Sequence, residues 1–196
     1  LVTGASEVAG RVNKFLQNIR EVDAIMQVVR IFEDKDIIHV HDKVDPLFDI
    51  EVINMELEAA GIKKPVLYVV NTSEVAENKR DVLDKIPGPY IEVDAIFGTG
   101  LDQLIKASYD LLNLITFLTT GEKESRAWTT GRGSSAPMAG RAIHTDFMEK
   151  FIRAEVVAYD KLIEAGSYAA ARAKGWVRIE GKEYVVQDGD VIEFLV

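Results

Sequence analysis

Four consecutive residues with hydrogen-bonding groups, Asn71-Thr-Ser-Glu74, follow directly on the apolar run Pro65–Val70. A short, β-branched run of this kind is typical of a buried strand in a parallel sheet. In open parallel sheets ligands bind beyond the carboxyl ends of the strands, so this loop is a candidate binding loop. Its amide can donate and accept hydrogen bonds and its carboxylate can accept them, which is the chemistry needed to read the edge of a heterocyclic base.

Spacing alone leaves two interpretations of this segment open. Guanine-specific NTPases place Asn-Lys-x-Asp at such a strand end, where the Asp accepts two hydrogen bonds from guanine. Here Thr72 replaces the Lys that packs beneath the base and Glu74 replaces the Asp, so guanine selectivity should weaken. The other interpretation is a plain strand-to-helix turn, because Asn and Ser are good turn and cap residues.

The elements that must position this loop alternate between strand and helix patterns. Apolar runs predict strands over 24–32, 65–70 and 90–93. Apolar spacing and start signals predict helices over 13–21, 45–59, 76–85 and 101–113. This alternation predicts a doubly wound, parallel α/β sheet. In the last helix we expect an inward face made of Leu104, Ile105, Tyr109 and Leu112.

The pattern changes after Asn113. Short strands are predicted over 115–120, 126–130, 156–159, 176–179, 184–186 and 191–195. Helices are predicted over 168–174 and over 146–153, with Thr145 as the N-cap of the latter. Gly181 and Asp188-Gly189 are hairpin signals. The second half therefore reads as a small mixed sheet clasping a helix.

Motifs in both halves resemble those of the YchF/Obg-like ATPases, which are P-loop NTPases of the Obg type. In the first half these motifs are Leu1-Val-Thr-Gly-Ala-Ser, Asn13-Lys-Phe-Leu, Val28-Val-Arg-Ile-Phe-Glu-Asp and Val44-Asp-Pro-Leu-Phe-Asp-Ile. In the second half they are Ser125-Arg-Ala-Trp-Thr, Ile143-His-Thr-Asp-Phe, Phe151-Ile-Arg-Ala-Glu-Val and Val185-Val-Gln-Asp-Gly-Asp. The resemblance implies a partial, doubly wound P-loop NTPase (G-domain) portion over 1–110, followed by a ubiquitin-like β-grasp TGS domain over 111–196.

Two parts of the family pattern are missing from this sequence. No G-x-x-x-x-G-K-[ST] occurs, so the phosphate cradle and its Mg²⁺-binding hydroxyl are absent. A helical insertion is expected after Ala59-Ala60, where Gly61-Ile-Lys-Lys leads straight into the next strand. We therefore expect part of a longer protein, with a paralogue that lacks the P-loop as the alternative. Mg²⁺ is the implied cofactor, with its ligands outside this chain.

The resemblance also implies roles for individual residues. The base contacts carried over are the side chain of Asn71 and the backbone of Thr72, with Glu74 in the same loop and Ala95 closing over the base. Asp94 stands where related proteins have Ser, and a base-contacting role there is open. Leu1 stands where many GTPases have a Gln that orients water, and an apolar side chain cannot do this; packing on the core is the alternative. We expect no catalytic residue within the chain.

Other catalytic and metal chemistry finds no support in the sequence. The chain has no Cys, which excludes a disulfide framework, a Cys-ligated zinc and a thiol nucleophile. His39, His41 and His144 do not form a ligand cluster. His144-Thr-Asp-Phe resembles a TGS signature, for which a turn and helix-cap role is the interpretation we favour.

Charge is distributed unevenly along the chain. The net charge is −9 overall, −8 over residues 1–110 and −1 over 111–196, yet residues 123–153 carry +3. A clustered positive patch can bind RNA even in an acidic protein, because phosphate contacts release counterions. The candidate RNA-binding residues are Arg126, Arg132, Arg141, Lys150 and Arg153. Trp128 is either a stacking surface or part of the core.

Together these observations predict a nucleotide-binding and hydrolysing protein that prefers ATP over GTP and associates with ribosomes or rRNA. This chain alone should be inactive. The competing classes are a non-enzymatic RNA- or ribosome-binding adaptor and a protein–protein module using a sheet edge. No window approaches ~20 uncharged apolar residues, so no membrane partner is expected. A cytoplasmic monomer is the expected state.

Overall fold

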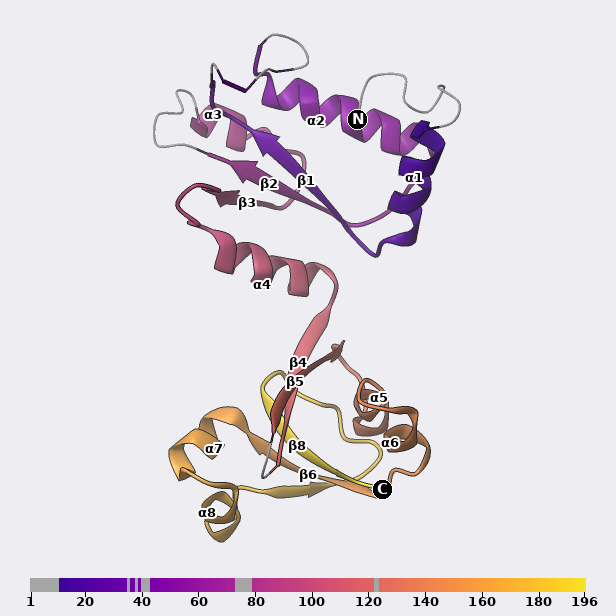
Figure 1. Ribbon diagram of the computed structural model, residues 1–196, viewed down its shortest axis with the longest axis vertical. Coiled ribbons are helices and arrows are strands. Elements are labelled where there is room, and N and C mark those ends of the chain that lie inside the picture. The colour runs from indigo at the N-terminus through magenta and orange to yellow at the C-terminus, as the bar shows by residue number, and fades with distance from the viewer. Residues whose placement is uncertain (1–10, 35, 38, 40–42, 73–78, 122–123) are drawn as a thin grey trace. The chain divides into compact units, whose positions relative to one another are not determined.

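The structure is a computed structural model that describes residues 11–34, 36–37, 39, 43–72, 79–121 and 124–196, with residues 11–15 in backbone only. The chain divides into two compact units, which we call unit 1 (Leu1–Leu112) and unit 2 (Asn113–Val196). Figure 1 shows the helices and strands of each unit. No helix of the described residues is long and apolar enough to span a membrane.

Unit 1 contains three parallel strands in the order β1-β2-β3. The strands are β1 (Ile25–Arg30), β2 (Val66–Asn71) and β3 (Tyr90–Val93). The helices are α1 (Arg11–Glu21), α2 (Pro46–Ala59), α3 (Lys79–Leu83) and α4 (Leu101–Leu111). Strands and helices alternate along the chain and the sheet is parallel, so the predicted α/β class and the parallel sheet are confirmed.

Local sequence explains where α2 starts and stops. Asp45 caps the helix by accepting a hydrogen bond from the backbone N–H of Phe48 at 3.2 Å, and Pro46 occupies the first turn, where it costs no hydrogen bond. Gly61, with φ of 66°, ends the helix in the left-handed conformation that glycine adopts freely. The predicted span over 45–59 is confirmed.

The two faces of the unit 1 sheet are covered to different degrees. One face packs under α2 in a core that includes Val29, Ile50 and Val70. On the other face α4 contacts β2 and β3 (Figure 1). On that second face Met26 and Val28 of β1 remain 47% and 68% exposed.

The inward face expected for α4 is wrong in part. Ile105 is 60% exposed and Tyr109 is 37% exposed, and Leu101 continues this exposed stripe one turn earlier. Leu104 and Leu112 are partly buried, as expected. The helix itself was predicted correctly, but the face that packs on the sheet carries Leu104 and Ser108, and Ile105 and Tyr109 lie outside it. Helical spacing defines a stripe, and only packing decides which stripe is covered.

Unit 2 contains a five-stranded mixed sheet in the order β5-β4-β8-β6-β7. Its strands are β4 (Leu114–Thr120), β5 (Ser125–Gly131), β6 (Arg153–Ala158), β7 (Arg178–Glu180) and β8 (Asp190–Leu195). The helices are α5 (Ala136–Gly140), α6 (Thr145–Glu149), α7 (Tyr159–Ala165) and α8 (Tyr168–Ala173). β4 and β8 run parallel, and the other pairings are antiparallel.

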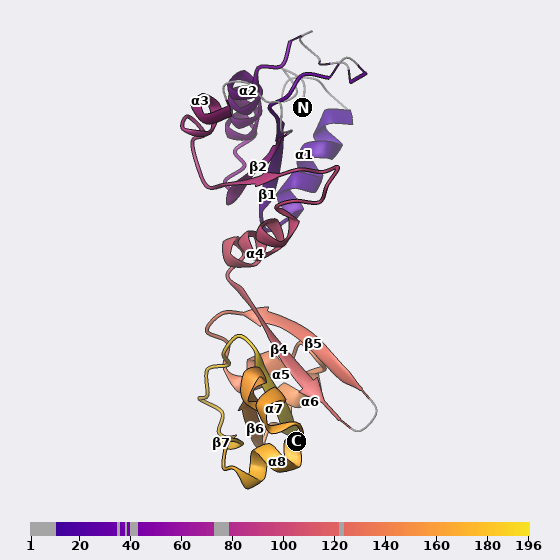
Figure 2. The same ribbon diagram turned by 90° about the vertical axis from the view of Figure 1, so that its left-hand side faces the viewer.

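Both faces of the unit 2 sheet are covered. The α5–α6 segment packs on one face, over a core in which Phe117 and Val156 are fully buried. α7 and α8 pack on the other face, around Val157 and Val191. Figure 2 shows the two helix pairs with the sheet between them.

Three sequence expectations for unit 2 need correction. The helices α5 and α7 were not predicted, because α5 lies in a stretch rich in Gly, Ser and Ala without an apolar period and α7 directly follows a strand without a clear start signal. The helix expected over 146–153 ends at Glu149, where the chain turns into β6. The strand expected over 184–186 is a single bridge between Ser135 and Val185, because the neighbouring residues form turns around Asp190 instead.

Candidate functional site

The carboxyl ends of β2 and β3 bring the two predicted binding loops together. Asn71 pairs in register with Val93, and the Thr72 N–H donates to the Val93 carbonyl at 2.8 Å. Beyond the strands, the Ala95 N–H donates to the Asn71 side-chain oxygen at 3.3 Å. Asn71, Thr72 and Ala95, all expected to contact a base, therefore lie close together, although Asn71 and Ala95 are 24 positions apart in the sequence.

A tight turn after β3 holds Ala95 in this place. The Asp94 carboxylate accepts hydrogen bonds from the backbone N–H groups of Ile96 and Phe97 at 2.9 and 3.0 Å. At Gly100 a side chain cannot fit, since an added Cβ would lie 2.1 Å from the Glu92 carbonyl oxygen. Asp94 thus organises its own turn, and Gly98-Thr-Gly is the turn that starts α4, as the sequence indicates.

Two apolar side chains next to this turn were missed by the sequence analysis. Ile96 is 85% exposed and Phe97 is 77% exposed, the two highest values among the large hydrophobic residues described. An apolar, solvent-facing surface beside the Asn71–Ala95 hydrogen bond suits the flat face of a heterocyclic base. The sequence contains a signal for this exposure, because Ile96 and Phe97 lie in a short turn between the polar residues Asp94 and Thr99.

Two residues of the predicted site lie outside the described part of the chain. Glu74 belongs to the segment 73–78, and Leu1 belongs to the segment 1–10. Their expected roles stay predictions.

The two histidines that the structure describes, His39 and His144, contact residues at the starts of helices α2 and α6. The His39 Nε2 atom lies 2.9 Å from the Asp49 carboxylate at the start of α2. His144 caps α6, because its Nδ1 accepts a hydrogen bond from the Asp146 N–H at 3.2 Å, so His144 and not Thr145 is the N-cap. Nowhere in the described ranges do three or more His, Cys, Asp or Glu side chains gather in a way that could hold a metal ion.

The five basic candidates are all exposed but lie on different elements of unit 2. Arg126 lies on β5, Arg132 follows it, Arg141 ends α5, Lys150 ends α6 and Arg153 begins β6. Lys150 pairs with Asp146 at 3.0 Å, and this contact lowers the pKa of the Asp146 carboxyl. The structure therefore distributes these cations over several elements of unit 2.

Trp128 belongs to the core. Its ring packs against the cluster around Phe117, and its indole N–H donates to the Thr119 hydroxyl at 2.9 Å. The guanidinium of Arg126 lies 4.2 Å from the ring centroid. The indole is thus already covered, which argues against the stacking role and for the core role.

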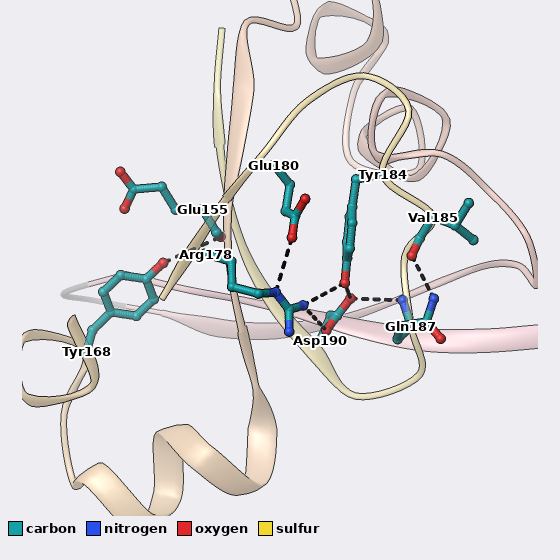
Figure 3. Close-up of polar contacts among 8 residues, drawn as sticks. All are labelled: Glu155, Tyr168, Arg178, Glu180, Tyr184, Val185, Gln187 and Asp190. Atoms are coloured by element: carbon teal, nitrogen blue, oxygen red, sulfur yellow. Dashed lines mark hydrogen bonds and ion pairs between the residues drawn. The ribbon is translucent and has the colours of Figure 1, made fainter. Parts of the chain in front are cut away.

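A polar cluster lies at the start of β8 (Figure 3). The buried Asp190 carboxylate accepts hydrogen bonds from the Tyr184 hydroxyl at 2.7 Å and from the Gln187 N–H at 2.8 Å. The Arg178 guanidinium donates to Tyr184 at 2.8 Å. Burial and the hydrogen bond to Asp190 raise the pKa of Tyr184. Each of these polar groups has a hydrogen-bond partner within the cluster. The cluster, which we call the polar clasp, is therefore a structural network that needs no ligand.

Comparisons with known proteins agree in both halves. Residues 114–196 match a family model named YchF-GTPase_C and described as a protein of unknown function (DUF933). The chain is 38% identical to the ribosome-binding ATPase YchF of Bacillus subtilis and 33% identical to that of Escherichia coli O157:H7. These alignments cover 99% and 100% of the chain and 78% of each relative.

A solved structure shows the same fold. The YchF GTPase of Schizosaccharomyces pombe superposes with a TM-score of 0.78 at 26% identity, over 96% of this chain and 76% of that one. The alignment with the B. subtilis protein spans 287 residues although this chain has 196, so that relative has stretches with no counterpart here. The identity to the bacterial proteins and the share of their length that is matched show that the chain belongs to the YchF family.

Proposed function

We propose that the Asn71–Ala95 edge of unit 1 recognises the base of a nucleotide, in a protein that hydrolyses ATP in preference to GTP. The observation that carries this proposal is the hydrogen bond between the Ala95 N–H and the Asn71 side-chain oxygen. It joins two loops expected to hold a base and leaves the Asn71 amide NH₂ to donate to N7, an acceptor that both purines present.

The donors and acceptors of this edge favour adenine. Guanine presents an acceptor, O6, where adenine presents a donor, the N6 amine. The Ala95 N–H is already engaged with Asn71, and the Thr72 N–H is engaged with Val93, so neither is available to O6. The Thr72 carbonyl has no hydrogen-bond donor among the described residues, and a carbonyl accepts from the adenine amine but not from O6.

For unit 2 we propose a β-grasp domain of the TGS type. Support comes from the strand order, with a hairpin of β4 and β5, a parallel pairing of β4 with β8 in the centre, and β6 and β7 completing the sheet. Relatives of the chain are named ribosome-binding, which supports ribosomes or rRNA as the partner of this unit. A cytoplasmic monomer is the state that fits this role.

The residues present do not fit Mg²⁺ or a triphosphate. The sequence has no G-x-x-x-x-G-K-[ST], and the described ranges hold no cluster of carboxylates or imidazoles for a metal ion. Phosphoryl transfer depends on the groups that position and neutralise the phosphates, so the 196-residue polypeptide by itself should not hydrolyse ATP or GTP. The second candidate function is a non-enzymatic ribosome-binding adaptor, which rests on the relatives being named ribosome-binding.

Base recognition can be tested on the chain itself by NMR, which detects weak binding. In ¹H–¹⁵N spectra, ATP should shift the backbone amides of Thr72, Ala95 and Phe97 and the side-chain amide of Asn71 at lower concentration than GTP does. Asn71→Ala should weaken binding of both nucleotides, because N7 is common to both, and should reduce the selectivity because it frees the Ala95 N–H for O6. Lys63→Ala, at the opposite end of β2, should change neither. Equal or larger shifts with GTP would disprove the adenine argument, and no shifts at this edge with either nucleotide would favour the adaptor.

A second test uses the neighbouring loop residue. Glu74→Asp should move the preference towards GTP only in part, because Thr72 still occupies the position of the packing Lys. A complete switch to GTP would show that the carboxylate alone sets the selectivity.

A further inference from the structure

Three cations on α7 and α8 lie outside the basic stretch that the sequence singles out. Lys161 lies on α7, Arg172 on α8, and Lys174 at the C-cap of α8. We call them the α7–α8 cation cluster. From Asp160 to Ile179, the stretch that contains this cluster, four basic and two acidic residues give a net charge of +2 in 20 residues, against +3 in 31 residues for 123–153.

Two of these cations share one aromatic ring. The Nζ atoms of Lys161 and Lys174 lie 4.9 and 4.4 Å from the centroid of the Trp176 indole. The electron-rich face of an indole stabilises a nearby ammonium group. Glu164 pairs with Lys161 at 2.9 Å, but Lys174 has no ion-pair partner within the described residues. A net positive charge is therefore held at a fixed place on the surface.

The third cation, Arg172, forms an ion pair with a buried carboxylate. Its Nη2 atom binds Glu155 of β6, whose side chain is only 9% exposed, while the Arg172 side chain is 56% exposed. Its guanidinium also lies 5.7 Å from the Tyr168 ring centroid, and Tyr168 donates in turn to the Glu155 carbonyl at 3.5 Å (Figure 3). Among the described residues only the Nη2 atom of this guanidinium donates a hydrogen bond, to Glu155, and a guanidinium fork matches the oxygens of a phosphate.

We propose that the α7–α8 cation cluster binds the phosphodiester backbone of RNA. This inference rests on the proposed association with ribosomal RNA. Bases are not the target, because Trp176 and Tyr168 pack against the core around Val157 and cations cover their faces. Protection of the edge strand β7 against aggregation does not explain the cluster, since all three residues lie on α7 or α8 and none lies on the strand.

The test measures binding of the whole chain to protein-free ribosomal RNA by fluorescence anisotropy over a series of KCl concentrations. Each phosphate contact contributes about 0.7 to 0.9 to the slope of log K against log salt. Lys174→Ala should lower that slope by one contact and weaken binding about fivefold or more at 0.1 M salt. Lys174→Arg should keep the slope, because the charge is retained. Arg172→Ala is avoided because it would leave Glu155 buried without its partner.

The matched control is Lys106→Ala, which removes an exposed cation from α4 of unit 1 and changes the net charge equally. It should leave the slope unchanged. If Lys174→Ala binds RNA like the unsubstituted chain while alanine at Arg126, Arg132, Arg141, Lys150 and Arg153 abolishes binding, the cluster is not the site, and the proposed function stands. If the chain binds ribosomes but not protein-free RNA, the partner is a protein and both ideas of an RNA contact are wrong.

Discussion

Neighbouring residues in β1 of unit 1 and in β6 of unit 2 show how differently the two units bury their sheets. In β6, Val156 and Val157 point to opposite faces, and both are fully buried. In β1, Val29 is 4% exposed and Val28 is 68% exposed. A strand is buried on both sides only where helices cover both faces, which is the case for β6 in unit 2 and for β2 in unit 1, whereas the edge strands β5 and β7 of unit 2 are largely exposed.

The difference indicates where each unit obtains its stability and what it offers to other molecules. Unit 2 has a closed core on each face of its sheet, and its candidate binding groups are cations on the outer helices. Unit 1 relies on the core under α2, and it exposes apolar side chains on β1, on α4 and in the turn after β3.

The largest expected effect is loss of the closed core of unit 2. Phe117→Ala removes a fully buried ring and should lower the free energy of unfolding of unit 2 by about 3–5 kcal/mol. Both tryptophans, Trp128 and Trp176, lie in unit 2, so their fluorescence in urea follows this unit specifically. A shift of less than about 1 kcal/mol would contradict the closed-core description.

A smaller effect is expected at the polar clasp of the same unit. Tyr184→Phe removes the hydroxyl that donates to the buried Asp190 and should cost about 1.5–3 kcal/mol, the range for hydrogen bonds to charged groups. The measurement is again tryptophan fluorescence in urea. Tyr159→Phe, an exposed tyrosine on α7, is the control and should change the midpoint little.

Alkaline titration tests how Tyr168 packs in the core between α7, α8 and the sheet of unit 2. Burial, followed by the charges of Glu155 and Glu193, raises the pKa of Tyr168 to about 12, from an ordinary value near 10. The neutral phenol therefore favours the folded state up to about pH 10, and this contribution is lost as the pH rises towards 12. Tyrosinate absorbance should show a component near pH 12 that disappears in Tyr168→Phe. A normal titration of all six tyrosines would contradict this packing.

The smallest effect is expected on the open face of unit 1. Val28→Thr should change stability by no more than about 0.5 kcal/mol, because the side chain is mostly in water already. The matched substitution Val29→Thr, one residue along and buried, should be clearly destabilising. Far-UV circular dichroism in urea compares the two variants. Equal costs at both positions would mean that something covers Val28 in solution.

Local signals in the sequence were sufficient for much of unit 1. Asp45 followed by Pro46 starts a helix through a side-chain cap and a fixed φ, and both act within one turn of the chain. The apolar runs that became β1, β2 and β3 are short and β-branched, so strand and parallel sheet were predictable without a partner. Asn71 and Ala95 could be singled out as candidates because each directly follows or nearly follows such a run.

Tertiary structure alone decided the rest, because the deciding contacts join residues far apart in the sequence. The Asn71 oxygen meets the Ala95 N–H across 24 positions, and that contact determines which groups are left for a base. The exposure of Ile105 depends on which side of α4 meets the sheet. Arg172 becomes a fixed donor only through Glu155, 17 positions away, and Lys161 meets Lys174 only at Trp176. Periodicity and capping act within a few residues, whereas these arrangements require the sheet to have formed.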